Sequence, residues 1–107
     1  MTIDFVNLTP HTVNVIDIDG NIWKSFPSAG VARVSTQTEQ KAVIDGIALF
    51  GVVYGDIIGL PDAVKGVRYI VSALVKAAAP FRIDLVSPHD LVRDDAGNVI
   101  GCRGFAV

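Results

Sequence analysis

Short apolar runs, each closed by a turn signal, dominate the hydrophobic pattern of this chain. Val and Ile supply many of the apolar positions, and β-branched residues favour pleated strands. Pro, Gly, Asn and Asp separate the runs, as they do in turns. The pattern predicts strands at residues 3–7, 12–18, 21–26, 31–35, 41–45, 47–54, 67–71, 83–86, 91–93 and 98–102. Short strands at this close spacing are typical of a small barrel or sandwich, so the expected fold class is mainly β.

One segment departs from this pattern and has the features of a short helix. Ser72 stands at an N-cap position, an alanine-rich run follows it, and Pro80 ends the run. Serine favours the N-cap, and alanine is the strongest helix former. We therefore expect one short helix over residues 73–79.

Two more patterns bear on the middle of the chain. The polar run Thr36–Gln40 predicts a loop between strands. Glycines recur at positions 46, 51, 55 and 59 among β-branched residues, and in strands such glycines mark bulges or sharp bends. Further on, Val67, Tyr69 and Val71 alternate with other residues and predict one buried face of a strand.

A short pattern occurs twice, near opposite ends of the sequence. Thr9-Pro10-His11 and Ser87-Pro88-His89 each precede a β-rich run, a Gly-Asn turn and a second β-rich run. Asp19-Gly20 in the first copy is a strong hairpin signal. The repeat predicts two hairpin units, which are either structurally related or alike only through their turn chemistry.

The composition describes a single domain spanning residues 1–107, in which 50% of the residues are hydrophobic. A small domain has too little interior for so many apolar residues, so we expect a homo-oligomer with apolar surface between subunits. The net charge is −2 and the basic residues are scattered, which argues against a nucleic-acid partner. Aspartates interrupt the most apolar stretch, residues 42–60, which argues against a membrane partner.

The compartment expected from the sequence is the cytoplasm. The single cysteine, Cys102, has no intrachain partner for a disulfide, which fits a reducing environment. The first residues, Met-Thr-Ile-Asp-Phe, lack the basic start of a signal peptide.

Several short motifs together carry a resemblance to a known family. They are Asn7-Leu8-Thr9-Pro10-His11, Gly59-Leu60-Pro61, Tyr69-Ile70-Val71-Ser72, and Arg93-Asp94 leading to Gly101-Cys102-Arg103-Gly104. In this order they resemble a family of small uncharacterised phage and prophage proteins. The resemblance implies a phage or mobile-element origin and a life in the host cytoplasm, and it carries no catalytic residues.

The two histidines are the first candidates for a site. If the hairpin units pair about a pseudo-two-fold axis, His11 and His89 converge, and with Asp90 or Cys102 they would hold an anion or a metal. The chain has no close Cys/His pair of the kind a structural zinc site uses, so we expect no metal and no cofactor. The simpler alternative is that each histidine forms hydrogen bonds locally, where Pro directs the chain into a strand.

Arginines are the second candidates, because their planar guanidinium captures carboxylate or phosphate in a bidentate manner. Arg82, Arg93 and Arg103 lie in the C-terminal part, and in an oligomer they would line an anion site between subunits. Neighbouring aspartates offer the alternative of surface ion pairs, which contribute about 0–1 kcal/mol each.

These observations lead to three hypotheses of function. The first is a non-enzymatic phage-type accessory protein that binds a host protein, or a small anionic ligand through His11, His89, Arg82, Arg93 and Arg103. The second is a structural or assembly component of a virion. The third is a small hydrolase or lyase that uses His89, for which the serines at 72 and 87 lack the glycine pattern of a nucleophile elbow.

Overall fold

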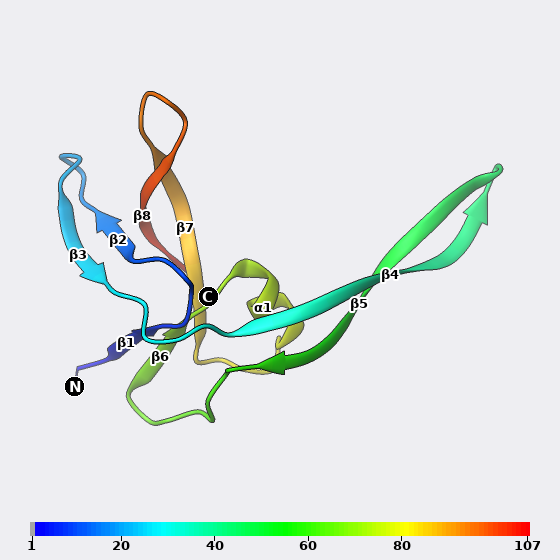
Figure 1. The fold of residues 1–107 in the computed structure, drawn as a ribbon, viewed down its shortest axis with the longest axis horizontal. Coiled ribbons are helices and arrows are strands. Elements are labelled where there is room, and N and C mark those ends of the chain that lie inside the picture. Colours follow the sequence, from blue (N-terminus) through cyan, green and yellow to red (C-terminus); the bar gives the residue numbers. More distant parts are fainter. Residues whose placement is uncertain (1) are drawn as a thin grey trace.

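A computed structural model describes residues 2–107 and is mainly β with one short helix, as the sequence predicts (Figure 1). The elements in chain order are β1 (Asp4–Asn7), β2 (Val13–Ile16), β3 (Ile22–Phe26), β4 (Arg33–Ile44), β5 (Ile47–Ile58), β6 (Val67–Ile70), α1 (Ala73–Ala78), β7 (Leu85–Arg93) and β8 (Val99–Ala106). Six strands form one sheet in the order β1-β6-β7-β8-β2-β3, and β4 pairs with β5 as a separate hairpin.

Strand β7 joins the two halves of the six-stranded sheet. Its first residues pair with β6 in parallel, with Leu85 opposite Tyr69 and Val86 opposite Ile70. The rest of β7, from Ser87 to Arg93, pairs with β8 antiparallel. The sequence predicted a break at Ser87-Pro88-His89 and two separate strands, and this prediction is wrong. Pro88 lies inside the strand, and its φ is compatible with an extended backbone.

Each face of the sheet carries its own hydrophobic cluster. On one face, α1 and the segment leading into β4 cover Tyr69, Val71 and Leu85. Ile70 and Val86 point to the other face, where they pack with Val13, Val15 and Cys102. The predicted face of Val67, Tyr69 and Val71 is therefore confirmed, because all three belong to the first cluster. Phe5, Phe26 and Phe105 surround the second cluster, with ring centroids 5.3 to 6.1 Å apart.

The sheet curls without closing into a barrel, and Asn7 holds its two edges together. Asn7 forms an isolated parallel bridge with Ser28, just beyond β3. The buried Asn7 amide donates to the carbonyls of His11 and Phe26, and its Oδ1 accepts from the N–H and the hydroxyl of Thr9. The Asn7-Leu8-Thr9-Pro10-His11 motif thus has a structural role, which is to join the end of β1 to the start of β2 and the end of β3.

The helix forms where the sequence predicts it. The Ser72 hydroxyl accepts a hydrogen bond from the Val75 N–H and caps the N-terminus of α1. Val75 is the fully buried residue of the helix and anchors it on the first cluster. In the described residues, 2–107, no helix has the length and apolar content needed to cross a membrane.

The β4–β5 hairpin, called the arm from here on, projects away from the sheet (Figure 1). The prediction of a loop at Thr36–Gln40 is wrong, because these residues continue β4 without interruption. Thr36 and Thr38 are β-branched, and they pair with Tyr54 and Val52 across the hairpin. The polar character of the run reflects exposure and not a turn.

Glycines in the arm lie at its turn, near its register shifts and at its base, where the sequence predicts bulges or sharp bends. At the tip, Asp45 and Gly46 both have positive φ, 53° and 79°, which is the requirement of a two-residue type I′ turn. Gly55 lies beside Ser35, where the β4–β5 register shifts between Val34 and Thr36. Gly51 pairs with Glu39 next to the second shift, and an added Cβ on Gly51 would lie 2.9 Å from the Lys41 side chain. At the base, Gly59 has φ +84°, and an added Cβ there would lie 2.3 Å from the Val31 carbonyl oxygen.

The two repeated segments do form two hairpins, β2–β3 and β7–β8, with the same loop. In each loop an aspartate Oδ1, of Asp17 or Asp94, accepts from the backbone N–H two and four residues further on. Gly20 and Gly97 occupy the same loop position with φ 85°. The similarity of the loops therefore has a direct cause in the shared Asp-x-x-Gly-Asn sequence.

Candidate functional site

The two histidines do not occupy equivalent positions. His11 precedes β2, and its backbone carbonyl accepts from Asn7 Nδ2 and Thr9 Oγ1. His89 lies within β7, opposite Gly104 of β8. Residues 2–107 contain no group of three or more His, Cys, Asp or Glu side chains placed to hold a metal ion.

Arg82 forms the most enclosed ion pair of the described chain. Its Nε and one terminal nitrogen each donate to a carboxylate oxygen of Asp84 at 2.8 Å, and that terminal nitrogen also donates to the Pro61 carbonyl. Bidentate bonding to Arg82 lowers the pKa of the Asp84 carboxyl and raises that of the guanidinium. Arg82 therefore fastens the segment before β7 to the connection between β5 and β6.

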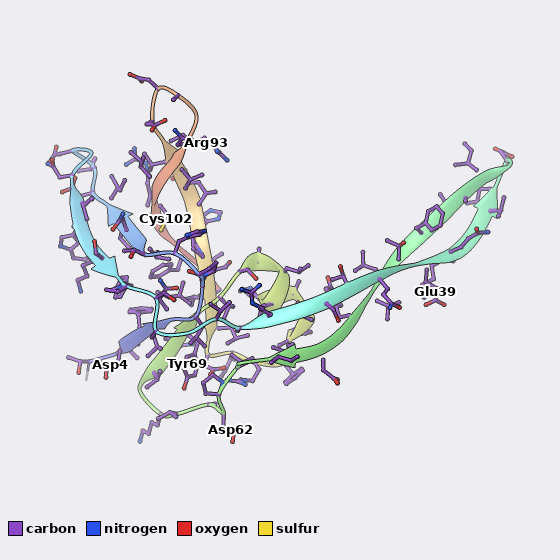
Figure 2. All side chains as sticks on the ribbon, viewed as in Figure 1. Asp4, Glu39, Asp62, Tyr69, Arg93 and Cys102 are labelled. Carbon is purple, nitrogen blue, oxygen red and sulfur yellow. The ribbon has the colours of Figure 1, made fainter. Side chains whose placement is uncertain are left out.

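The other two predicted arginines use donors near the β7–β8 hairpin. Arg93, close to the end of the hairpin, donates to the Gly97 carbonyl of the loop (Figure 2). Arg103 donates to the Asp17 carbonyl, and its Nε lies 4.0 Å from Asp90. These bonds do not test ligand binding, which stays a prediction for His11, His89, Arg82, Arg93 and Arg103.

A groove of about 560 Å³ lies between the two hairpins, and its lining is mostly apolar. His11 and Pro88 contribute to its wall, together with Leu91, Val99 and Ile100. Cys102 lies at the floor between the hairpins, where burial raises the pKa of its thiol (Figure 2). This groove brings one residue from each Pro-His motif together, although His89 itself is not part of its lining.

The arm is the candidate functional surface that the sequence interpretation missed. The radius of gyration is 16.6 Å, whereas a compact domain of this length has one of about 13 Å. The chain exposes 7374 Å², against about 5,700 Å² for a compact monomer of 11.3 kDa. An excess of about 1,600 Å² on one chain is about twice the ~800 Å² that each partner buries in a standard protein interface.

Most of the arm's large apolar side chains are exposed, and the arm is apolar along both faces. Their exposed fractions range from 39% at Tyr54 to 72% at Ile58. The exposed set comprises Val43, Ile44, Ile47, Leu49, Phe50, Val52, Val53, Tyr54 and Ile58. Monomeric soluble proteins rarely expose a large apolar surface, so the arm is the strongest candidate for a contact surface in the described chain.

A second groove lies where the arm meets α1. It has a volume of about 500 Å³ and is lined by Val31, Ile58 and Leu74, with the charged side chains of Arg33 and Asp56 at the same place. Leu74 is exposed on α1 although it stands in a hydrophobic run. The groove continues the apolar surface of the arm onto the body of the protein.

The arm could have been recognised from the apolar surplus together with the length of the run Ile47–Ile58. The sequence contains both signals. However, the polar run 36–40 predicts a loop, so the 12-residue strand β4 is expected as two short strands. No protein-family model matches the chain, and comparisons with curated proteins and with solved structures find no similar protein. The arm and the grooves are therefore interpreted from their own chemistry.

Proposed function

We propose that this chain is a non-enzymatic binding protein whose first partner is another copy of itself, and that it serves as a structural or assembly component. The observation that carries the proposal is the arm, which exposes apolar residues on both faces. Burial of apolar surface contributes about 25 cal/mol per Å². An assembly that covers the arm therefore recovers stabilisation that the isolated chain lacks.

The arm also presents unpaired strand edges, which supports assembly further. Strands β4 and β5 pair only with each other in the described chain, so each has an outer edge of free backbone groups. Long, flat apolar edges promote association, and monomeric proteins shorten, charge or cover them. Here the edges are 12 residues long, which fits a chain that is covered by neighbours in its working form.

Among the non-enzymatic roles, the assembly role has more support than ligand capture. The resemblance to phage proteins makes a virion or its assembly the setting we propose, with the host cytoplasm as the place of action. Arg82 is engaged by Asp84 and Pro61, and the Ser72 hydroxyl caps α1, so a ligand or a reaction at either side chain would compete with these bonds. A host protein bound through the same arm is the alternative within this class.

The proposal is tested by comparing the mass in solution of the wild-type chain with that of Phe50→Lys and Val52→Lys variants. Charges placed on the arm should shift the protein from an oligomer toward the monomer, because each buries an unpaired ammonium in the assembled state. Ile18→Lys is the matched control, since Ile18 is 92% exposed but lies on the β2–β3 loop. The proposal fails if the wild type is monomeric, or if Ile18→Lys dissociates it as strongly as the arm variants do.

A second test separates the virion role from the host-binding role. If the source genome is that of a phage, the protein should be present in purified particles in a fixed ratio to the other components. A protein that is oligomeric but absent from particles would contradict the virion role and retain the self-assembly.

A further inference from the structure

We propose that two copies pair through one particular face of the arm, in an antiparallel arrangement about a two-fold axis. This inference rests on the proposed self-assembly. It specifies which face of the arm is buried, how the two arms are oriented, and where the tip of each arm contacts the other copy. The face consists of Thr36, Thr38, Gln40 and Val43 of β4 with Tyr54, Val52, Phe50 and Ala48 of β5, and is called the aromatic face.

The β4–β5 register separates the arm into two faces. Residues directly opposite each other in an antiparallel pair have their side chains on the same face, and successive residues alternate. Beyond the register shift near Ser35, the pairs 36–54, 38–52, 40–50 and 43–48 form the aromatic face. The pairs 37–53, 39–51, 42–49 and 44–47 form the opposite face, called the ion-pair face.

Charge distinguishes the two faces. The ion-pair face carries Glu39, whose carboxylate lies 3.4 Å from the Lys41 ammonium, and the Lys41 side chain lies against Gly51. Glu39 points outward halfway along the arm (Figure 2). The aromatic face has no charged residue among its eight positions and holds both aromatic residues of the arm. Interface cores are enriched in aromatic residues and depleted of charge, so the aromatic face is the one that docks.

The ends of the arm determine the orientation. The tip carries Asp45, and the base carries Arg33. A parallel arrangement would bring the two Asp45 carboxylates together, whereas an antiparallel arrangement brings each tip near the partner's base. Strands rise about 3.4 Å per residue, so centring the aromatic faces on each other brings Asp45 of one copy to the level of Arg33 and Val34 of the other. Each Asp45 then lies at the level of Arg33 of the other copy and away from the second Asp45.

The groove at the arm base fits the tip of the second copy. Ile58 and Leu74 give it an apolar lining, Arg33 offers a positive charge to Asp45, and Asp56 lines the same groove. The area is also sufficient: covering half of the excess exposed surface on each chain gives a total of about 1,600 Å², the size of a standard interface. Isologous pairing of this kind is the commonest closed symmetry of soluble oligomers.

The first test uses two cysteine variants at neighbouring positions on opposite faces, Val52→Cys and Val53→Cys. Both side chains are exposed in the single chain, and the native Cys102 is buried with a raised thiol pKa, so it reacts slowly. A short bis-maleimide should join two chains through Val52→Cys and not through Val53→Cys. In the assembled protein, a bulky monofunctional maleimide should modify Val52→Cys at least about tenfold more slowly than Val53→Cys.

The second test uses charge reversal at the ends of the arm. Arg33→Glu and Asp45→Lys should each raise the dissociation constant of the dimer by about tenfold. Each substitution disrupts two exposed Arg33–Asp45 pairs, one at each end of the dimer. Mixing the two variants should restore the dimer, because one end of the heterodimer then joins the two reversed charges and the other end joins the native Arg33 and Asp45. Only an arrangement that brings the tip to the partner's base gives this rescue.

The outcomes separate this inference from the proposed function. An oligomer that is cross-linked through Val53→Cys instead, or whose charge variants are not rescued by mixing, contradicts the aromatic face or its orientation while self-assembly stands. A wild-type chain that is monomeric contradicts both.

Discussion

Asn7 is the residue on which the junction between β1, β2 and β3 depends most. Its buried amide makes four hydrogen bonds, and nothing else in the described chain binds the Phe26 carbonyl through a side chain. Removal of a buried polar side chain leaves its partners desolvated and without hydrogen bonds. The Asn7 hydrogen bonds give a physical reason for the Asn7-Leu8-Thr9-Pro10-His11 motif.

We expect Asn7→Ala to lower the free energy of unfolding by about 2–4 kcal/mol, because the partly buried Phe26 carbonyl and Thr9 N–H lose the side chain that binds them, and the His11 carbonyl keeps only the Thr9 hydroxyl. Urea unfolding followed by circular dichroism measures the change. The control is Asn21→Ala, since Asn21 is exposed and contributes to its loop through its backbone. Equal stability of the two variants would show that the Asn7 bonds do not hold the junction.

The Arg82–Asp84 pair gives the fold a dependence on acid. The pKa of Asp84 is lowered in the folded state, mainly by its hydrogen bonds to Arg82. A carboxyl with a lowered folded pKa stabilises the fold above its unfolded pKa of about 3.9 and loses this contribution as the pH falls. Unfolding free energy should therefore decline below about pH 4–5. Asp94 has a lowered pKa as well, through the backbone N–H of Asn98, and adds to the same trend.

Asp84→Asn should flatten this decline and lower stability at neutral pH, where the charged pair is lost. Urea titrations at pH 7 and pH 4 measure both effects. A variant with the same pH dependence as the wild type would show that Asp84 does not titrate with a lowered pKa.

At the scale of elements, a single glycine allows the two hairpins to meet. Within the described residues, β2 and β8 share one register pair, Val15 with Cys102. At the adjacent Gly101, an added Cβ would lie 2.7 Å from both the Asn14 carbonyl oxygen and the Ile16 Cδ1. The hairpins can approach this closely only because Gly101 has no side chain.

Gly101→Ala should destabilise the fold by about 1–3 kcal/mol through overpacking at this contact. Gly104→Ala, in the same strand, should be nearly neutral, since an added Cβ there meets no atom within 4 Å. Thermal unfolding of the two variants provides the measurement. Similar melting temperatures for both would show that β2 and β8 do not depend on the close approach at Gly101.

The elements also show how much of this structure local sequence determines. The helix, the two hairpin loops and the buried face of β6 follow from an N-cap, an Asp-x-x-Gly-Asn loop and a two-residue period, all of which act over a few residues. Local sequence does not predict that β4 continues through Thr36–Gln40 or that β7 continues through Pro88. Both strands depend on pairing with a partner strand elsewhere in the chain. Pairing across the sheet overrode the local turn signals.

The sequence predicts that apolar surface is exposed, but it does not predict which element carries this surface. The apolar surplus predicts apolar surface outside the core, and β4 and β5 expose such residues, whereas the partner expected for them stays a prediction. Hydrophobic content alone does not say where such surface lies. The chemistry of histidine and arginine makes these residues candidates, and the structure shows the side chains of Arg82, Arg93 and Arg103 in hydrogen bonds within the chain. Which face of the arm is free of charge became visible only with the β4–β5 register.

At the scale of the whole molecule, the chain has a folded body and an arm with no core of its own. The body has two hydrophobic clusters, one on each face of its sheet. The outer part of the arm lacks such a cluster among the described residues, and its apolar side chains are exposed (Figure 1). This division is what we propose for a chain whose arm completes its packing in an assembly.

The measurement that tests this account most directly is the molar mass of the wild-type chain in solution, by light scattering across a wide range of concentrations. We expect a mass of at least twice the 11.3 kDa of the single chain, which falls toward that value only on dilution. A mass of 11.3 kDa at every concentration would contradict the account, because the arm would then be stable while exposed to water.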